Sequence, residues 1–453
     1  MRRLVIAATN SGIGKTTISC GIARALKDMN YDVSCFKVGA DYIDIGYHKI
    51  ASGNTSSNLD EFMLSKDEIR KIFSKKARDI SIVEGVMGLF DGYQDMSDYC
   101  STSSMAKILD ANVILIVDAS KMSSSIAALV KGFIEFDKDL KIRGLILNNV
   151  NTQSHYNILK SAIKKISDIK VLGYIPKMKD IGFSSRHLGL NLADEDVENE
   201  EKIRKIADVI KQHIDLNALV ELSENEDILC ESDEKKKDYD VVLALAKDKA
   251  FNFYYEDGIE YLKSKGVKIV EFDTFKDEKL PYCHAVYIGG GYPELYAKDI
   301  SKNKSLMRDI YEKSNQNMPI YAECGGLMYL GEKIISNDEE YDMVGIFEGV
   351  STMSEKLQRF GYFNARSKLD TPILKKGQEI KGHEFHYSTF QSEVDTAFDM
   401  TKILYDKSVK KWTGGYLKNN TLATYLHFHF ANDIIAENFC QSMDKYKKIL
   451  ELK

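Results

Sequence analysis

The chain has 453 residues, of which 44% are hydrophobic and 29% are charged, and its formal net charge is -6 at pH 7. This length is too great for one ordinary core and predicts two domains, and the acidic balance argues against a nucleic-acid partner. No apolar run approaches the ~20 residues that cross a bilayer and no secretory signal is recognisable, so we expect a cytoplasmic protein with no membrane partner.

The first predicted elements are a strand, a glycine-containing loop and a helix. Leu4–Ala7 is a short apolar run, and apolar residues recur at helical spacing from Thr17 to Leu26. The loop between them, Ser11-Gly-Ile-Gly-Lys-Thr-Thr17, is typical of a site for a nucleotide triphosphate. Thr9 replaces the glycine that usually begins this pattern, so an ordinary strand-to-helix turn is the alternative.

In such a loop each residue type has a distinct task. The glycines let backbone N–H groups approach the phosphates, the lysine reaches the outer phosphates, and the hydroxyl after the lysine ligates Mg²⁺. These tasks fall here on the ATP-binding candidates Gly12, Gly14, Lys15, Thr16 and Thr17.

Charged residues follow the next two predicted strands. Lys37, Asp41 and Asp44 come after the run that begins at Val33, and Glu84 ends a later apolar strand. Because ligands bind at the carboxyl ends of parallel strands, we expect these side chains to face the nucleotide or its co-substrate. Glu84 suits a carboxylate that orients Mg²⁺ or water, whereas a solvated loop is the alternative for the first three.

Two further apolar runs, Val113–Asp118 and Gly144–Asn148, complete a pattern of strands alternating with helical spacers. This pattern predicts a mostly parallel, doubly wound sheet. Asn148 either contacts the adenine edge of the nucleotide or caps the helix that follows. Arg186 lies in a basic segment suited to an acidic substrate. We expect this domain to cover residues 1–225, followed by a charged linker over 226–238.

The second domain, residues 239–453, begins again with strands and helices in alternation. Three consecutive glycines from Gly289 follow one strand, where freed backbone N–H groups can form part of an oxyanion hole. Cys324 follows another strand and stands between small residues at a strand-to-helix turn, which predicts a nucleophile elbow. The other six cysteines show no Cys-x-x-Cys spacing and no comparable context.

Histidines near the end of the chain provide candidate bases for this cysteine. The alternating segment Thr424–Phe430 predicts a strand that places His427 and His429 on one face, one of them acting as the base. A second pair, His383 and His386, flanks Glu384. A metal site there is an alternative, but neither pair has the spacing of a familiar zinc motif.

Over nearly its whole length the chain resembles the cobyrinic acid a,c-diamide synthase family. The matching segments of the first half are Ser11–Thr17, Lys37–Asp44, Asn58–Asp60, Glu84–Gly92 and Arg186–Leu190. Those of the second half are Ala250–Tyr255, Gly289–Glu294, Ala322–Gly326, Gly382–Ser388 and Tyr425–Phe430.

The resemblance implies an α/β protein made of two domains. The first would be a P-loop, dethiobiotin-synthetase-like, doubly wound parallel sheet domain, and the second a class I glutamine amidotransferase α/β domain. In the first domain, the resemblance implies that the phosphate loop and Asn148 bind ATP. Mg²⁺ would be bound by Thr16, by Glu84 and by either Asp41 or Asp60. The substrate would be bound by Lys37, Asp44 and Arg186. In the second domain, the implied roles are Cys324 as nucleophile, His427 as base, and Gly290 and Gly325 as oxyanion donors.

Three positions depart from the family pattern. Ala40 and Ile45 replace prolines that often flank the Asp-Tyr-Ile-Asp segment, which leaves its acids in place. His429 stands where amidotransferases usually carry a glutamate, so the third member of the catalytic triad is unassigned. This dyad-like form is itself a property of the corrinoid amidases.

The resemblance implies ATP-dependent amidation of the a and c acetates of cobyrinic acid, with L-glutamine as the ammonia donor and Mg²⁺ accompanying ATP. A related tetrapyrrole such as nickel sirohydrochlorin is the alternative substrate. An alternative of another class is a switch ATPase with a non-catalytic amidotransferase-like module, but such switches carry a second lysine where Asn10 or Ser11 stands. A homodimer is the working expectation for the assembly.

Overall fold

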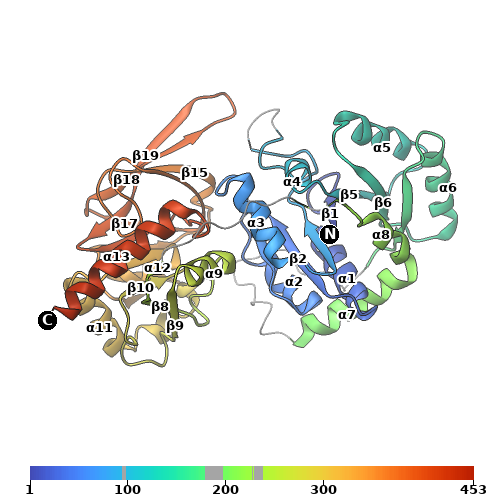
Figure 1. The fold of residues 1–453 in the computed structure, drawn as a ribbon. Helices are drawn as coiled ribbons and strands as arrows, with labels where there is room; N and C mark the ends of the chain where they lie inside the picture. Colours follow the sequence, from blue (N-terminus) through green and yellow to red (C-terminus); the bar gives the residue numbers. More distant parts are fainter. Residues whose placement is uncertain (94–97, 179–196, 227, 229–237, 453) are drawn as a thin grey trace. The chain divides into compact units, whose positions relative to one another are not determined.

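The computed structural model describes residues 1–93, 98–178, 197–226, 228 and 238–452. The chain divides into two units, Met1–Glu231 and Ser232–Lys453 (Figure 1). Arg186 and nearly all of the predicted linker lie outside the described residues. Among the described helices, none is both long enough and apolar enough to span a bilayer.

The first unit is built on a seven-stranded sheet in which every neighbouring pair is parallel, in the order β3-β2-β4-β1-β5-β6-β7. Its strands are β1 Arg2–Ala8, β2 Val33–Val38, β3 Ser57–Leu59, β4 Ile80–Glu84, β5 Asn112–Asp118, β6 Ile142–Asn148 and β7 Lys170–Ile175. β2, β4, β1 and β5 are successive neighbours, so the residues at their carboxyl ends meet at one edge.

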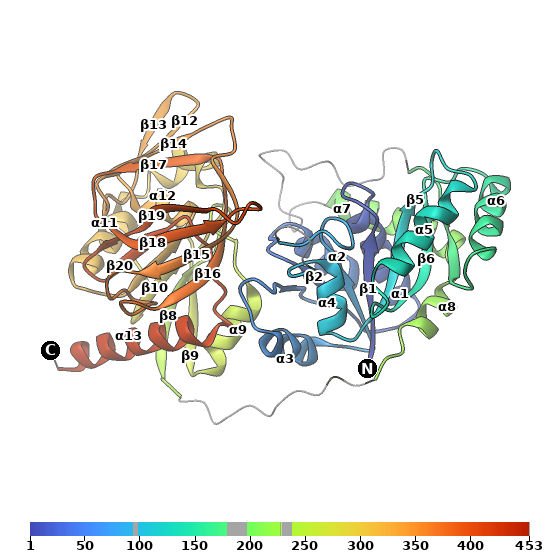
Figure 2. The same cartoon turned by 90° about the horizontal axis from the view of Figure 1, so that it is seen from above.

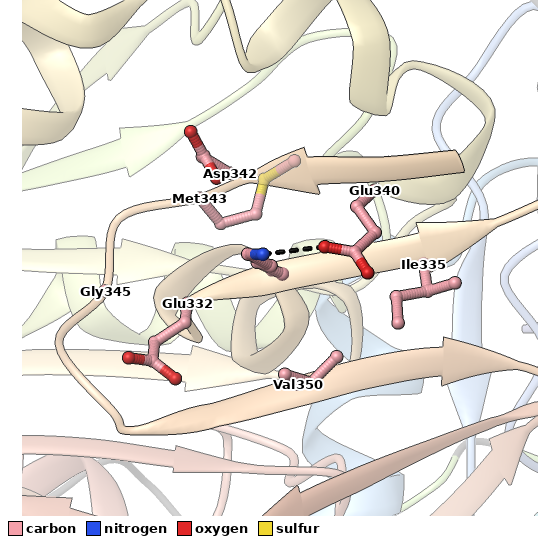
Figure 3. Close-up of a pocket in the computed structure, with 8 residues that line it drawn as sticks. Glu332, Ile335, Glu340, Asp342, Met343, Gly345 and Val350 are labelled. Carbon is pink, nitrogen blue, oxygen red and sulfur yellow. Dashed lines mark hydrogen bonds and ion pairs between the residues drawn. The ribbon is translucent and has the colours of Figure 1, made fainter. Parts of the chain in front are cut away.

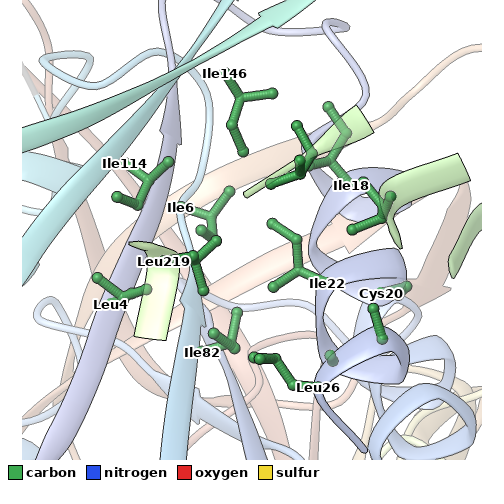
Figure 4. Packing of buried hydrophobic residues seen from close by; sticks show 14 of the residues in the cluster. Leu4, Ile6, Ile18, Cys20, Ile22, Leu26, Ile82, Ile114, Ile146 and Leu219 are labelled. Atoms are coloured by element: carbon green, nitrogen blue, oxygen red, sulfur yellow. The ribbon is translucent and has the colours of Figure 1, made fainter. Parts of the chain in front are cut away.

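Helices cover both faces of this sheet. They are α1 Lys15–Asp28, α2 Asp44–Ser52, α3 Lys66–Lys76, α4 Thr102–Ile108, α5 Ser125–Phe136, α6 Gln153–Lys164, α7 Val197–His213 and α8 Leu216–Leu222. On one face, Ile6 and Ile82 pack against Ile22 of α1 in a core that also includes α7 and α8 (Figure 4). On the other face, Phe36 of β2 packs against Phe73 of α3, with ring centroids 4.8 Å apart.

This arrangement explains the sequence pattern. Strands that are buried on both faces show nearly continuous apolar runs instead of alternation, and β1 is buried at every position from Arg3 to Ala8. The predicted doubly wound parallel sheet is therefore confirmed.

The second unit contains a nine-stranded sheet in the order β16-β15-β18-β19-β20-β11-β10-β8-β9. The neighbours from β20 to β9 are parallel, and the remaining strands continue the sheet in antiparallel pairs. The parallel strands are β8 Val241–Ala246, β9 Val267–Phe272, β10 Ala285–Ile288, β11 Ile320–Glu323 and β20 Thr421–Thr424. The antiparallel strands are β15 Arg359–Ser367, β16 Glu379–His386, β18 Thr396–Ile403 and β19 Val409–Lys418.

A small second sheet has the order β13-β12-β14-β17. Its strands are β12 Lys333–Ser336, β13 Glu339–Asp342, β14 Gly349–Met353 and β17 Ser388–Ser392. The helices of the unit are α9 Glu256–Ser264, the 3₁₀ helix η2 Pro293–Leu295, α10 Ala297–Ile300, α11 Lys304–Asn315, α12 Gly325–Leu330 and α13 Asp433–Glu451. The C-terminal α13 packs on β8 and α9 (Figure 2).

The prediction of a strand over Thr424–Phe430 is wrong. β20 ends at Thr424, and beyond it His427 forms only an isolated bridge with His383. β20 cannot continue beyond Thr424, because β11, the strand with which it pairs in parallel, ends at Glu323. There the backbone turns into α12. The two histidines therefore do not share a strand face.

Candidate active site

The phosphate loop of the first unit joins β1 to α1. Gly12 and Gly14 have φ angles of 78° and 92°, in the left-handed region that glycine adopts without strain. Gly14 is the N-cap of α1 and provides no side-chain cap, so the first N–H groups of the helix are available to an anion. The loop thus has the backbone form of the predicted phosphate site.

Lys15 begins α1 and is buried, with its ammonium donating to the Met87 carbonyl at 2.5 Å. Burial lowers the pKa of Lys15, and the neighbouring charge of Lys37 lowers it further. The structure therefore holds the Lys15 ammonium against the segment that follows β4. An anionic phosphate near Lys15 would offset this loss of hydration and the repulsion.

Glu84, the last residue of β4, is the centre of a buried polar network. Its Oε1 accepts from Thr16 Oγ1 at 2.7 Å and from Lys37 Nζ at 2.6 Å, and its Oε2 lies 2.6 Å from His48 Nε2. Burial alone would raise the pKa of Glu84, but Lys37 and His48 outweigh burial and hold that pKa well below its usual range. Glu84 is therefore an anion beside the Thr16 hydroxyl.

Asp44 is the second acid beside Thr16. Its Oδ2 lies 2.8 Å from Lys37 Nζ and 3.3 Å from Thr16 Oγ1. The other two predicted acids make local backbone contacts: Asp41 Oδ1 accepts from the N–H groups of Ile43 and Asp44, and Asp60 Oδ1 from those of Phe62 and Met63. The geometry thus groups Thr16 with Glu84 and Asp44, and places Asp41 and Asp60 at turns.

The donor set of Thr16, Glu84 and Asp44 fits Mg²⁺ as the partner of a nucleotide. Mg²⁺ takes one or two carboxylates together with phosphate oxygens and waters, in place of an all-protein cage. Within the described part of the chain, no group of three or more His, Cys, Asp and Glu suited to a metal occurs.

Asn148 ends β6 and contacts the phosphate loop directly. Its Nδ2 donates to the Ile13 carbonyl at 2.7 Å, and its Oδ1 accepts from the Asn149 N–H at 2.9 Å. Both ends of the amide are thus engaged by backbone in this structure, which makes Asn148 a support for the loop. The predicted contact with adenine stays a prediction.

The nucleophile elbow of the second unit lies between β11 and α12. Cys324 has φ 48° and ψ −101°, a left-handed conformation that is strained for a residue with a side chain. Its N–H donates to the Thr424 carbonyl at 2.7 Å. A Cβ on Gly326 would lie 2.4 Å from the Ile288 carbonyl oxygen, so only glycine fits this position. The strained turn predicted from the sequence is present.

His427 links Cys324 to a carboxylate that the sequence analysis missed. The imidazole interacts with the Cys324 side chain, which raises the pKa of His427, and its Nδ1 lies 3.2 Å from Glu323 Oε2. Glu323 is fully buried and also accepts from the Tyr321 hydroxyl at 2.6 Å and the Phe428 N–H at 3.2 Å. Cys324, His427 and Glu323 thus form the geometry of a catalytic triad.

The charge of the imidazole follows from these two contacts. Burial disfavours the imidazolium, but the bonds to Cys324 and Glu323 outweigh burial and raise the pKa of His427 to about 10. The protonated His427 therefore lies beside the Cys324 sulfur, the nucleophilic atom of the elbow. The arrangement can therefore attack a carbonyl carbon and then protonate a leaving amine.

The remaining histidines hold other positions. The ring of His383 stacks on that of His427 with centroids 4.9 Å apart, and its Nε2 lies 2.6 Å from the Tyr255 hydroxyl. Burial and the two neighbouring histidines hold the pKa of His383 well below its usual range. His429 stacks on Tyr255 at 4.5 Å, and its Nδ1 accepts from the Ala431 N–H. Of the two predicted bases, His427 is the one at the cysteine.

The predicted oxyanion glycines lie against the triad. A Cβ on Gly290 would come within 2.6 Å of His427 Cε1, and a Cβ on Gly325 would come within 3.2 Å of the Gly291 nitrogen. The glycine turn after β10 therefore closes over both the imidazole and the elbow. Gly291, the third glycine of this turn, lies next to Gly325. Its backbone N–H is therefore a further candidate donor to the oxyanion, beside that of Gly290.

A hollow of about 490 Å³ opens on the small sheet of the second unit (Figure 3). Its lining residues are Glu332, Lys333, Ile335, Glu340, Asp342, Met343, Gly345 and Val350. Lys333 Nζ contacts Glu340 there at 2.6 Å. None of the described site residues predicted from the sequence contributes to this hollow, so it belongs to neither candidate site.

Comparison with known proteins assigns each unit to a domain type. The family model of the CobQ/CobB/MinD/ParA nucleotide binding domain matches residues 4–190, and that of the CobB/CobQ-like glutamine amidotransferase domain matches residues 241–434. The cobyrinate a,c-diamide synthase of Listeria innocua is 43% identical over 436 residues, which cover 95% of this chain and 96% of the relative. The chain belongs to the cobyrinate a,c-diamide synthase family.

Other members show the same extent of similarity. The Salmonella typhimurium enzyme is 42% identical over 94% of this chain and 95% of its own, and the Caldanaerobacter subterraneus enzyme is 42% identical over the same shares. Family membership confirms the resemblance and the predicted fold class, a phosphate-loop domain joined to a glutamine amidotransferase domain. The chain is thus a carbon–nitrogen ligase of the glutamine-dependent type.

Proposed function

We propose that this chain amidates the a and c acetate carboxylates of cobyrinic acid, using ATP and ammonia released from glutamine. The observation that carries the proposal is the buried arrangement of Cys324, His427 and Glu323. It occurs in a chain whose relatives over nearly its full length carry the name cobyrinate a,c-diamide synthase.

The glutaminase half-reaction follows from the triad. The Cys324 thiolate attacks the side-chain amide carbon of glutamine, and N–H groups of the glycine turn and of Gly325 stabilise the tetrahedral oxyanion. His427 gives its proton to the departing nitrogen, which leaves as ammonia. Water then hydrolyses the γ-glutamyl thioester to glutamate with His427 as base, and Glu323 keeps the imidazole oriented through both steps.

The ligase half-reaction needs an activated carboxylate, because a carboxylate does not condense with ammonia in water. Transfer of the γ-phosphoryl group of ATP to an acetate of the substrate forms an acyl phosphate and ADP, and ammonia then displaces phosphate to give the amide. Lys15 and the N–H groups at the start of α1 bind the phosphates. Mg²⁺, held by Thr16, Glu84 and Asp44, would neutralise charge on the transferring phosphoryl group.

Lys37 has a place in this half-reaction as well. Burial opposes its charge, but Glu84 and Asp44 outweigh burial and hold the pKa of Lys37 well above its usual range. Lys37 is therefore a permanent cation beside Thr16, suited to an acetate of the substrate or to the phosphoryl group in transfer.

The substrate is tested by mass spectrometry. The purified full chain is given ATP, Mg²⁺ and glutamine with either cobyrinic acid or nickel sirohydrochlorin. We expect cobyrinic acid to show the mass change of two carboxyl-to-amide conversions. Conversion of nickel sirohydrochlorin alone would move the assignment to that tetrapyrrole, and conversion of neither would overturn the proposal.

A further inference from the structure

A second polar group lies beside Cys324, on residues that the triad does not use. The Thr424 carbonyl accepts from the Cys324 N–H at 2.7 Å, and Tyr425 follows directly after Thr424 in the chain. The Tyr425 hydroxyl contacts Ser388 Oγ at 2.9 Å, and its ring stacks on that of His386 with centroids 3.8 Å apart. His386 therefore connects the surroundings of the nucleophile to β16.

An ion pair continues this polar path. His386 Nε2 lies 3.4 Å from Glu384 Oε2, and the same oxygen lies 3.4 Å from Arg359 Nε. Arg359 stands opposite His386 in the β15–β16 register, and Glu384 stands two residues before His386, so the three side chains share one face. The polar path thus runs from Tyr425 through His386 to a carboxylate and a guanidinium.

The two charged groups differ in exposure. The side chain of Glu384 is 6% exposed, whereas that of Arg359 is 38% exposed and stacks over Trp412 at 4.3 Å. The contact to Glu384 uses Arg359 Nε, and a guanidinium carries further N–H donors on both Nη atoms. A buried anion and an accessible, oriented cation are thus held side by side.

We propose that Glu384 and Arg359 bind the amino-acid head group of glutamine, while the side-chain amide of the substrate reaches Cys324. Glu384 accepts from the α-ammonium group, and the Nη atoms of Arg359 donate to the α-carboxylate. Opposite charges at fixed positions match a zwitterion, and charge-assisted hydrogen bonds in a partly buried site give both affinity and selectivity. This assignment rests on the proposed glutaminase function.

The test uses three amides and a matched pair of controls. Glutamine has both head-group charges, glutaramate lacks the ammonium, and γ-aminobutyramide lacks the carboxylate. kcat/KM for hydrolysis of each amide is measured for the full chain, for Glu384→Gln and for Arg359→Gln. The controls are Arg366→Gln and Glu379→Gln, because this ion pair joins the same two strands at 3.8 Å and both its side chains are exposed.

We expect Glu384→Gln to lower kcat/KM about tenfold or more for glutamine and γ-aminobutyramide, with glutaramate unchanged. Arg359→Gln should lower it for glutamine and glutaramate, with γ-aminobutyramide unchanged. The control variants should match the unaltered chain. A misfolded variant would lose all three activities together, which distinguishes a folding defect from loss of recognition.

Equal losses for all three amides in a variant that unfolds at the same temperature as the unaltered chain, or no loss for any amide, would overturn the assignment of the head-group site. The glutaminase proposal has its own readout, since Cys324→Ala should abolish hydrolysis of every amide. If Cys324→Ala hydrolysed glutamine as fast as the unaltered chain, the proposed function would fail, whatever the result for Glu384 and Arg359.

Discussion

A fully buried carboxylate requires several donors to offset the loss of hydration. Glu323 has the Tyr321 hydroxyl, the Phe428 N–H and the His427 imidazole. The hydrogen bond to Nδ1 fixes which imidazole nitrogen faces the sulfur, and the negative charge of Glu323 stabilises the imidazolium. Under the proposed function, Glu323 takes the role of the glutamate that amidotransferases usually carry at the position of His429.

The Glu323→Gln substitution tests this role through pH dependence. Below about pH 10 His427 keeps the proton that the departing nitrogen requires, and this proton is lost as the pH rises through that value. Removing the Glu323 charge lowers the pKa of His427, so the alkaline limb of the glutaminase rate should move to lower pH. We also expect kcat to fall by roughly 10²-fold or more, because the imidazole loses its orientation.

The control is Tyr321→Phe, which removes one donor to Glu323 and keeps the carboxylate. Its alkaline limb should stay where the unaltered chain has it. An unchanged pH profile in Glu323→Gln would show that the carboxylate does not act on His427.

The sequence predicted Cys324 and His427 as nucleophile and base, and it gave no signal for Glu323, which the structure places beside His427. Adjacent residues of a strand point to opposite faces, so a residue next to the nucleophile is not an obvious partner for the same imidazole. β11 ends at Glu323 and the backbone turns at Cys324, which allows both side chains to reach His427. The sequence could not distinguish Asp44 from Asp41 and Asp60, because all three follow strands at the same edge of the sheet. Only the structure shows that Asp44 is the one beside Thr16.

At the level of secondary structure, the turn between β11 and α12 is the element on which the second site depends. Gly326 lies so close to β10 that an added Cβ would meet the carbonyl oxygens of Ile288 and Gly289, at 2.4 Å and 3.1 Å. Both are backbone atoms of a buried strand end and cannot move independently. The close approach is what holds Cys324 in its left-handed conformation.

We therefore expect Gly326→Ala to destabilise the second unit by about 1–3 kcal/mol and to displace the elbow. Thermal unfolding should report the lower stability, and glutaminase activity should fall by more than the unfolded fraction explains. Gly414→Ala is the matched control, because its added Cβ would lie 3.4 Å from Met400 Cγ, at ordinary contact distance. A Gly326→Ala variant with the stability and activity of the control would contradict the role of this turn.

The elements that the sequence predicted well are the buried parallel strands, because burial on both faces leaves apolar runs with polar ends. The antiparallel half of the second sheet was not predicted, since strands such as β19 are exposed along much of their length and carry several lysines. The segment after Thr424 alternates like a strand, but it forms only the isolated bridge with His383 among the described residues.

For the molecule as a whole, the proposed function assigns one half-reaction to each unit. The first carries the phosphate loop with Thr16, Glu84 and Lys37, and the second carries the triad. Composition and periodicity predicted two α/β domains, whereas the pairing of a ligase with a glutaminase came from motifs. Membership of the family supports the same pairing.

The division of the reaction between the two units is tested most directly by comparing glutamine with ammonia as the nitrogen source for amidation of cobyrinic acid. With Cys324→Ala, glutamine-dependent amidation should fall by about 10³-fold or more, while ammonia-dependent amidation should continue at the rate of the unaltered chain. Lys15→Ala should lose both. If Cys324→Ala kept its glutamine-dependent rate, or lost both activities while remaining folded, the division of the reaction between the two units would be contradicted.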